Sequence, residues 1–325
     1  MIRQTFKIDP FQTLDWYYDS LVDWAAGGRI LTLDGQLSNA KWYTTYIFDT
    51  AITSSNGQYA FIYTRLGTKG LLLKDGKIIR EINRSYYCAN VYEYPAAFVS
   101  LSNGKTYLVH CPISYCQLDI EDVETGEIIT NIPGRKPSDV FHSRLEVSPC
   151  NGYLLSKGWV WHPWDVVLIF DINACLEKPN LLDENNFMPA FNTEICTASF
   201  CNETSVLFGS SEEPAMDMDE TDLLPSGHIA LWDISRKKLS NPIKVQGEFG
   251  NLVAIDERYA WDLYKFPKII NLASGTIEDK CEEINTGTQK SSIIRSLEGI
   301  PLISANRNLK KLAIYTPGQM DILSL

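Results

Sequence analysis

The side chains best suited to bind a charged partner or an ion lie in one acidic stretch, residues 210–227. This stretch contains no Lys or Arg and six carboxylates: Glu212, Glu213, Asp217, Asp219, Glu220 and Asp222. Asp217-x-Asp219-x-Thr221 has the spacing of the first ligands of a calcium-binding loop. However, Asp222 replaces the glycine that such a loop needs at its sixth position, and His228 replaces the glutamate at the twelfth. We therefore expect no calcium or other metal ion here.

Two interpretations of the acidic stretch stay open. An acidic run is most often a solvated loop. Alternatively, its carboxylates attract a basic partner, while Met216 and Met218 provide adaptable apolar contacts. Long insertions without secondary structure are often functional in compact folds, which favours the second interpretation as much as the first.

A second conspicuous segment, residues 158–165, holds three tryptophans. Side chains two residues apart in a strand share a face, so we interpret Trp159 and Trp161 as filling space inside the fold. Pro163 marks a turn, because proline cannot donate to a strand ladder. Trp164 is then the expected exposed anchor, since tryptophan is enriched at binding hot spots. The candidate partner contacts of this segment are Trp161, His162, Trp164 and Asp165.

Motifs for catalysis are missing from the sequence. It contains no G-x-S-x-G nucleophile elbow, no H-E-x-x-H metal motif and no G-x-G-x-x-G dinucleotide-binding motif. The segment 70–78 has one residue too many for a phosphate-binding loop and lacks its Ser or Thr. We therefore predict a protein that is not an enzyme and has no cofactor.

The chain as a whole is acidic, with 40 Asp and Glu against 29 Lys and Arg and a net charge of −11. Such a surface repels phosphate backbones and anionic lipids, so we expect a protein partner with a basic surface, no nucleic acid and no membrane. The N-terminal residues lack the apolar core of a secretion signal. Together with eight sparse cysteines, this predicts a cytoplasmic protein with reduced thiols.

The elements that must position these segments are predicted to be strands. Asn-Gly lies between apolar runs at 56–57, 103–104 and 151–152, a pattern that predicts hairpins with type I′ turns. A second strand-like unit recurs at intervals of about 40 to 60 residues. Its seven central residues are Leu31, Leu72, Leu118, Leu168, Leu231, Ile270 and Ile314. Four short strands per period of this length are typical of propeller blades.

We therefore predict an all-β fold, a seven-bladed β-propeller of four-stranded antiparallel blades. Residues 1–325 would form a single domain with an acidic loop insertion at 210–227. Ring closure is left open: residues 319–325 can supply the outer strand of their own blade, or residues 5–8 can add one across the seam. The innermost strands read as mostly apolar or small, which argues against a catalytic site in the central channel. We expect them near residues 51–54, 98–100, 145–148, 197–200 and 252–255.

Two segments give the chain a resemblance to the WD-repeat-like β-propellers. Residues 147–155 (VSPCNGYLL) look like the first hairpin of such a repeat, and residues 231–234 (LWDI) contain the Trp-Asp dipeptide. Residues 168–172 (LIFDI) are a near match with Phe170 for Trp. The Gly-His pair that usually opens each repeat is missing. The resemblance is therefore to a divergent member, and family-specific partners do not carry over.

The resemblance also implies where a partner binds. In such propellers, connections between the second and third strands share one face with the blade-to-blade connections, and function is usually found there or in the channel. Residues 158–165, 210–227 and 264–267 are three such connections. In the last, we interpret Tyr264 as core and Phe266 as a candidate contact. Three of the four histidines lie near consecutive connections, about 10 Å apart, which is too far for one metal ion.

The leading hypothesis is a non-enzymatic propeller that binds another protein through this face. An inhibitory or immunity-type protein that neutralises a basic toxin or enzyme fits the acidity, and a passive assembly scaffold fits as well. The rival class is a propeller hydrolase or lyase that acts in the central channel. A propeller that binds a small molecule is the third alternative.

Overall fold

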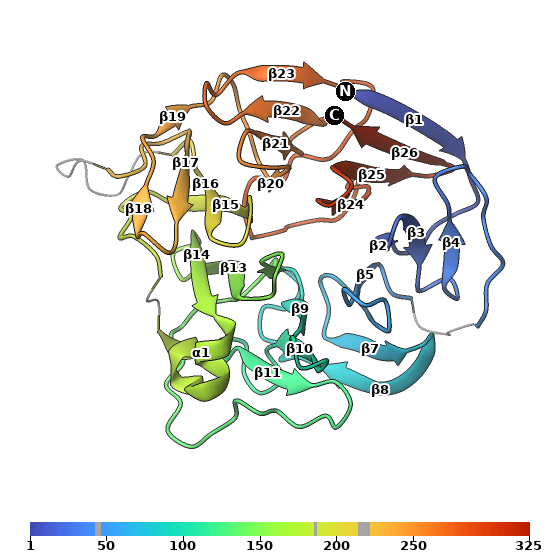
Figure 1. Cartoon of the computed structure of the whole chain (residues 1–325), viewed down its shortest axis with the longest axis horizontal. Helices are drawn as coiled ribbons and strands as arrows, with labels where there is room; N and C mark the ends of the chain where they lie inside the picture. The colour runs from blue at the N-terminus through green and yellow to red at the C-terminus, as the bar shows by residue number, and fades with distance from the viewer. Residues whose placement is uncertain (43–46, 185–186, 214–221) are drawn as a thin grey trace.

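The computed structural model describes residues 1–42, 47–184, 187–213 and 222–325, which form seven antiparallel sheets arranged in a ring (Figure 1). Each sheet is one blade, and successive blades follow one another along the chain. The prediction of an all-β, seven-bladed propeller is therefore confirmed.

Within a blade, the strands run outward from the channel in sequence order. Blade 1 contains β2 (Asp15–Tyr17), β3 (Ser20–Asp23) and β4 (Arg29–Leu31); blade 2 contains β5 (Thr50–Thr53), β6 (Tyr59–Tyr63), β7 (Lys69–Lys74) and β8 (Lys77–Asn83). Blade 3 contains β9 (Ala96–Ser100), β10 (Thr106–His110) and β11 (Asp119–Asp122); blade 4 contains β12 (Glu146–Val147), β13 (Tyr153–Val160) and β14 (Trp164–Asp171).

The remaining blades are numbered in the same way. Blade 5 contains β15 (Ile195–Phe200), β16 (Ser205–Ser210), β17 (His228–Asp233), β18 (Lys238–Leu239) and β19 (Ile243–Lys244). Blade 6 contains β20 (Leu252–Ala254), β21 (Tyr259–Asp262), β22 (Lys268–Asn271) and β23 (Ile277–Lys280). Blade 7 contains β24 (Leu302–Asn306), β25 (Lys311–Thr316) and β26 (Gln319–Ser324), with β1 (Ile2–Lys7) on its outer edge.

The outer strand is the least regular part of each blade. Two short strands share this position in blade 5, where β18 and β19 both pair with β17. In blades 1 and 3 a single bridge, at Leu37 and Ile128, takes its place. Blade 4 continues instead into helix α1 (Ile172–Glu177) and the 3-10 turn η1 (Pro179–Asp183). Among the described residues, the prediction of four strands is therefore wrong for blades 1, 3 and 4, which have three strands each.

The local sequence explains the helix in blade 4. Asp171 is an N-cap whose carboxylate accepts a hydrogen bond from Ala174 N at 2.9 Å, and the helix contains three good helix formers, Ala174, Leu176 and Glu177. The helix ends before Pro179. Across the described part of the chain, no helix has both the length and the apolar character needed to cross a membrane.

Apolar side chains between neighbouring blades form the core. Val99 and Leu118 of blade 3, for example, pack in one cluster with Leu154 and Phe170 of blade 4. Each such side chain contributes about 1.5–3 kcal/mol when it is fully buried. A single blade has two apolar faces and cannot cover either by itself, so every blade depends on both neighbours.

The Asn-Gly hairpins have a different turn from the one predicted. A type I′ turn needs positive φ at both central residues, but at the first two sites only the glycine is left-handed, with φ of 67° at Gly57 and 79° at Gly104. At the third site Asn151 has φ of 60° and Gly152 does not. These loops are longer than the two-residue loop of a type I′ turn and need only one left-handed residue. The asparagine side chain provides a hydrogen-bond acceptor within the turn, and Asn56 Oδ1 accepts from Gln58 N at 3.1 Å.

The ring is closed by the N-terminal strand. β1 pairs with β26 over its full length, from Ile2 opposite Ser324 to Lys7 opposite Gln319. Residues 319–324 are therefore the third strand of blade 7, and the alternative in which they form its outer strand is wrong. The join is reinforced by Asp321, which accepts hydrogen bonds from Arg3 Nε at 2.8 Å and Thr5 Oγ1 at 2.6 Å.

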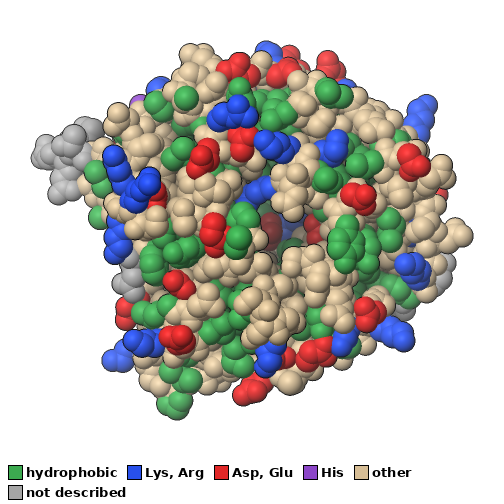
Figure 2. Space-filling model, in the orientation of Figure 1, with side chains coloured by type: hydrophobic (Ala, Val, Ile, Leu, Met, Phe, Trp, Pro, Cys, Tyr) green, Lys and Arg blue, Asp and Glu red, His purple; other side chains and the backbone are tan. Residues whose placement is uncertain are grey.

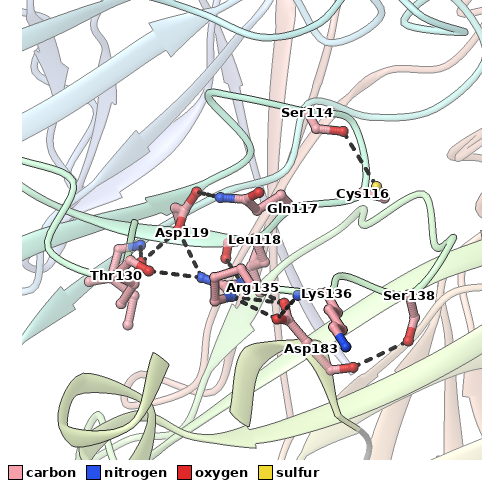
Figure 3. Close-up of polar contacts among 11 residues, drawn as sticks. Ser114, Cys116, Gln117, Leu118, Asp119, Thr130, Arg135, Lys136, Ser138 and Asp183 are labelled. Atoms are coloured by element: carbon pink, nitrogen blue, oxygen red, sulfur yellow. Dashed lines mark hydrogen bonds and ion pairs between the residues drawn. The ribbon is translucent and has the colours of Figure 1, made fainter. Parts of the chain in front are cut away.

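A buried arginine ties the irregular outer edges of blades 3 and 4 together (Figure 3). Arg135 donates to Asp183 at the end of η1, with Nε at 2.9 Å from both carboxylate oxygens, and to Asp119 of β11 at 3.1 Å. Its remaining donors reach the carbonyls of Thr130 and Leu118. Burial opposes the charge of Arg135, but Asp183 and Asp119 outweigh it, so the pKa of the guanidinium is raised. This network takes over the role of the missing strand pairing.

We expect Asp321→Asn to lower the unfolding free energy by about 1–3 kcal/mol near neutral pH, because it weakens hydrogen bonds to a charged acceptor at the closure. Burial opposes ionisation, but the bonds from Arg3, Thr5 and Gln319 lower the pKa of Asp321. Its stabilisation is therefore present above the unfolded pKa of about 3.9 and is lost as the pH falls below it. Urea unfolding between about pH 7 and pH 3 tests this. A difference from wild type that does not shrink with acidification contradicts it.

Candidate binding face and central channel

One end of the ring, which we call the loop face, gathers the connections that the sequence singled out. Residues 161–163 join β13 to β14, residues 211–227 join β16 to β17, and residues 263–267 join β21 to β22. Each therefore links the second strand of a blade to the third. The blade-to-blade connections lie at the same end, because alternate strands of a blade run in opposite directions.

The tryptophans of the first connection are arranged differently from the prediction. Trp159 is 3% exposed and fills space between elements, as expected. Trp161, in contrast, is 44% exposed, and Trp164 is half-buried. The interpretation that Trp161 is buried and Trp164 is the exposed anchor is therefore wrong. The strand ends at Val160, so Trp161 belongs to the turn and escapes the two-residue alternation.

Trp161 forms the edge of an aromatic cluster on the loop face, which we call the aromatic ledge: Tyr87, Tyr115, Phe141, Trp159 and Trp161. Phe141 stacks on Trp159 with ring centroids 3.9 Å apart and on Tyr115 at 4.6 Å. Tyr87 lies against Phe141 and Trp161. Tyr87 is 42% exposed, and the neighbouring Tyr86 is 86% exposed. A rigid aromatic surface therefore faces solvent.

Next to the ledge, a cavity of about 670 Å³ opens between blades 4 and 5. Its lining includes apolar side chains and charges of both signs, with carboxylates in excess: Trp164, Glu194, Glu212, Glu213, Phe249 and Lys290. Glu212 and Glu213 are exposed. Burial raises the pKa of Glu194, which accepts a hydrogen bond from Asp165 N at 2.8 Å. The cavity thus joins the two connections that the sequence singled out.

Asp165 does not offer its carboxylate to a partner, contrary to the prediction. It is 2% exposed and accepts a hydrogen bond from Ser292 N at 2.9 Å as well as one from the Ser292 hydroxyl. Burial raises the pKa of Asp165. Its role is to hold a segment of another blade connection, because both of its oxygens are used internally.

That segment, residues 285–296, crosses the loop face, and we call it the strap. At one end Lys265 N donates to Gly287 O at 2.6 Å, and at the other Ile294 N donates to Val91 O at 2.7 Å. Between them, Lys290 Nζ binds Glu212 at 2.8 Å and Glu248 at 3.2 Å. The same Nζ lies 4.5 Å from the centre of the Tyr264 ring. The strap therefore connects blade 6 with the connection that precedes blade 3.

The other predicted contacts are distributed as follows. Tyr264 is buried, as expected, and Phe266 is half-buried with Lys268 Nζ 4.9 Å from its ring centre. His162 is exposed in the turn. Asp222 is half-buried. The remaining candidates of the acidic stretch lie outside the described residues: Met216, Asp217, Met218, Asp219 and Glu220.

Sequence reasoning missed Tyr86, Tyr87 and the strap. The signal was present, because residues between the last strand of one blade and the first strand of the next must lie on the loop face. Tyr86-Tyr87 follows the end of blade 2 and precedes blade 3, which places both side chains there. Lys290 lies in the corresponding connection before blade 7.

The central channel is lined by charged side chains, so the interpretation of its innermost strands as mostly apolar or small does not describe the channel lining. Figure 2 shows the ring hollowed at its centre, with acidic and basic side chains inside the hollow. Innermost strands supply Asp15 and Glu146, and residues beside them supply Asp49, Arg144 and Arg307. These charged residues lie at the first position of an innermost strand or just outside one, so the apolar runs gave no sign of them.

Ion pairs cross the lower part of the channel. Glu146 of blade 4 binds Lys157 Nζ at 2.6 Å and is also bonded to Arg307 of blade 7. The same carboxylate accepts from Phe200 N of blade 5 at 2.8 Å. The channel holds an upper chamber of about 290 Å³ on the side of the loop face and a lower mouth of about 440 Å³, and Glu146 and Arg307 line the lower mouth. The charges of Glu146 and Arg307 are therefore paired with each other within the protein.

The histidines do not converge. His110 is buried beside Glu121 at 2.9 Å, and His142 is buried beside Ser156, with its pKa lowered by burial to about 4. Among the residues that the structure describes, no group of three or more His, Cys, Asp or Glu side chains is arranged to hold a metal ion.

The fold is similar to that of solved β-propellers, including a WD40 domain. A chain in the crystal structure of the mitotic checkpoint complex superimposes with a TM-score of 0.58 and 11% identity, covering 99% of this chain and 91% of that one. The Neurospora crassa Pan2 WD40 domain superimposes with a TM-score of 0.55 and 10% identity, covering 97% and 88%. No family model matches the sequence, and no curated protein matches it. The likeness is therefore one of fold.

Asp15→Asn is expected to stabilise the protein by about 1–3 kcal/mol at about pH 7.5. Burial raises the pKa of Asp15 to about 6, so above this pH the native state carries a disfavoured carboxylate. The stabilisation of the wild-type native state by the raised pKa is present below about pH 4 and is lost as the pH rises through about 6. The extra stability of Asp15→Asn over wild type should therefore vanish near pH 4. Urea unfolding at both pH values measures it, with the exposed Asp19→Asn as control. An equal gain at both pH values would contradict the assignment.

Proposed function

We propose that this chain is a non-enzymatic protein-interaction module of the cytoplasm that binds a partner through the loop face. The observation that carries the proposal is the exposed aromatic ledge beside an open, carboxylate-rich cavity. Large exposed apolar patches bordered by polar groups often mark sites where another protein binds. The WD40-type fold supports the same class of function.

The ledge provides the apolar part of the contact. Trp161 and Tyr87 are held in place by Phe141 and Trp159 beneath them, so they lose little conformational freedom when a partner docks. Tryptophan and tyrosine are enriched at hot spots for this reason. Tyr86, which is almost fully exposed, extends the surface toward blade 2.

The cavity provides the electrostatic part. Glu212 and Glu213 are exposed at its edge, and the whole chain carries a net charge of −11. A partner with a basic surface complements both, and long-range attraction would speed its association. Because exposed charges are screened over about 8–10 Å at physiological ionic strength, the complex should weaken as salt rises.

Two roles fit a contact of this kind. The chain neutralises a basic toxin or enzyme as an inhibitory or immunity-type protein, or it holds partners together as a scaffold. The net acidity of the chain favours the first role, and the fold is common to both. An activity assay of the purified partner, with and without this protein, distinguishes inhibition from scaffolding.

A hydrolase or lyase that acts in the central channel is the second candidate, and the charged side chains there favour it. Turnover of a substrate that is abolished by one channel substitution, such as Glu93→Gln, would replace the non-enzymatic proposal. The same channel substitution should leave partner binding on the loop face unchanged.

Trp161→Ala is expected to weaken the complex at least tenfold, because it removes the most exposed part of the ledge, and hot-spot residues contribute about 2 kcal/mol or more. The partner is first recovered from native cells by affinity purification at low salt, and its affinity is then measured by isothermal titration calorimetry. Tyr18→Ala is the control, since Tyr18 is also an exposed aromatic residue, at 60% against 44% for Trp161, but lies in the β2–β3 turn at the opposite end of the ring.

The double variant Glu212→Gln, Glu213→Gln tests the electrostatic part. It should slow association and reduce the salt dependence of the affinity while leaving the contact of Trp161 intact. If Trp161→Ala and Tyr18→Ala bind the partner equally well, the loop face is not the docking surface.

A further inference from the structure

The upper chamber of the channel has the features of a ligand site that is separate from the loop-face contact. It has a volume of about 290 Å³, room for about ten water-sized groups. Five charged side chains from different blades and connections line it: Asp15, Asp49, Arg65, Glu93 and Arg144. Tyr63, Asn251 and Gln289 add neutral polar groups. Such convergence of polar groups in one concavity is the usual mark of a small-molecule site.

Among the described residues, the hydrogen-bond acceptors of the Arg144 guanidinium are all neutral. Its guanidinium donates to Asn251 Oδ1 at 2.6 Å, to Cys196 O at 3.1 Å and to Lys157 O at 3.2 Å, all of them neutral oxygens. None of the ion pairs found in the described part of the chain includes it. Its backbone has a φ of 44°, which is rare and unfavourable for an arginine. Such strain concentrates at functional sites.

Arg65 and Glu93 are also incompletely paired. The closest approach of their charged groups is 4.0 Å, beyond hydrogen-bond distance. Arg65 donates from Nε to Thr50 Oγ1 at 3.2 Å, which leaves its two terminal nitrogens without a hydrogen-bond partner among the described residues. The Glu93 carboxylate accepts no hydrogen bond from the described residues, although its backbone carbonyl does. Both side chains are less than one-quarter exposed.

Charges of both signs are therefore under-satisfied around one small space. A simple anion would face Asp15, Asp49 and Glu93, and a simple cation would face Arg65 and Arg144. A ligand that carries both signs satisfies the two sets together, because buried charges are costly unless they are paired and hydrogen-bonded. The lower channel, where Glu146 already binds Lys157 and Arg307, offers no such opportunity.

We propose that the upper chamber binds a small zwitterion, a free amino acid. Its carboxylate lies against Arg65 and Arg144, and its ammonium group lies against Glu93 and Asp49. The volume accommodates the backbone atoms and a side chain of moderate size. This site is independent of the proposed partner contact, because none of the aromatic ledge or cavity carboxylates lines it.

The test screens the twenty standard L-amino acids at about 10 mM by thermal unfolding, followed by isothermal titration calorimetry of those that bind. An amino acid present at about one hundred times its Kd should raise the Tm by about 5 °C. The des-amino acid and the decarboxylated amine that correspond to the best binder are then titrated. Each lacks one charge, and we expect each to bind at least tenfold more weakly.

Two variants locate the site. Glu93→Gln should weaken the amino acid at least tenfold and leave the affinity for the des-amino acid unchanged, because that analogue has no ammonium group. Arg65→Gln should weaken the amino acid and leave the decarboxylated amine unchanged. Glu127→Gln, an exposed residue on the opposite end of blade 3, is the matched control and should bind like wild type.

The outcomes decide the proposal without reference to any partner protein. No saturable binding by any of the twenty amino acids overturns it. A des-amino acid that binds as tightly as its parent shows an anion site and also overturns it. Binding that persists in both variants places the ligand elsewhere. Because these assays use the free chain, they can fail while Trp161→Ala still abolishes partner binding, and the reverse also holds.

Discussion

The structure depends on apolar burial between neighbouring sheets. No blade can cover both of its faces, so each is stable only between two others, and the first and last blades must meet. The pairing of β1 with β26 makes that meeting possible. The rigid aromatic ledge and the charged channel both follow from this closed ring, because they are built from side chains that different blades hold at fixed positions.

The sequence predicted the repeats well because burial between blades imposes a local pattern. Six of the seven apolar runs lie at third strands, whereas the run around Ile314 is β25, the second strand of blade 7. The proposed innermost strands overlap β5, β9, β12, β15 and β20. Outer strands were less predictable because they cover one face only and tolerate substitution. Asp171 could start a helix there, and Arg135 could replace strand pairing with ion pairs. Ring closure joins the two ends of the chain, which no local pattern encodes.

The candidate site was predicted in part. The position of the connection at 161–163 followed from its pattern, but which tryptophan is exposed depended on a strand that ends one residue earlier than assumed. Asp165 looked available because Ser292, its partner, lies 127 residues away. The channel charges were overlooked because single charged residues beside apolar runs carry no periodic signal, and only the ring brings Asp15, Glu93 and Arg144 to one axis.

The closure by β1 has a consequence for the way in which the chain reaches its native state. Arg3 and Asp321 are separated by 318 positions, so the first strand must wait for the last blade to be synthesised. Until then, six blades form an open arc with an uncovered apolar face at each end, and an incomplete chain presents the unpaired strand edges that promote aggregation. Loop closure over such a separation is slow. The ring is thus most vulnerable just before β26 has been synthesised, when nearly every core residue of the propeller is present and the seam is still open.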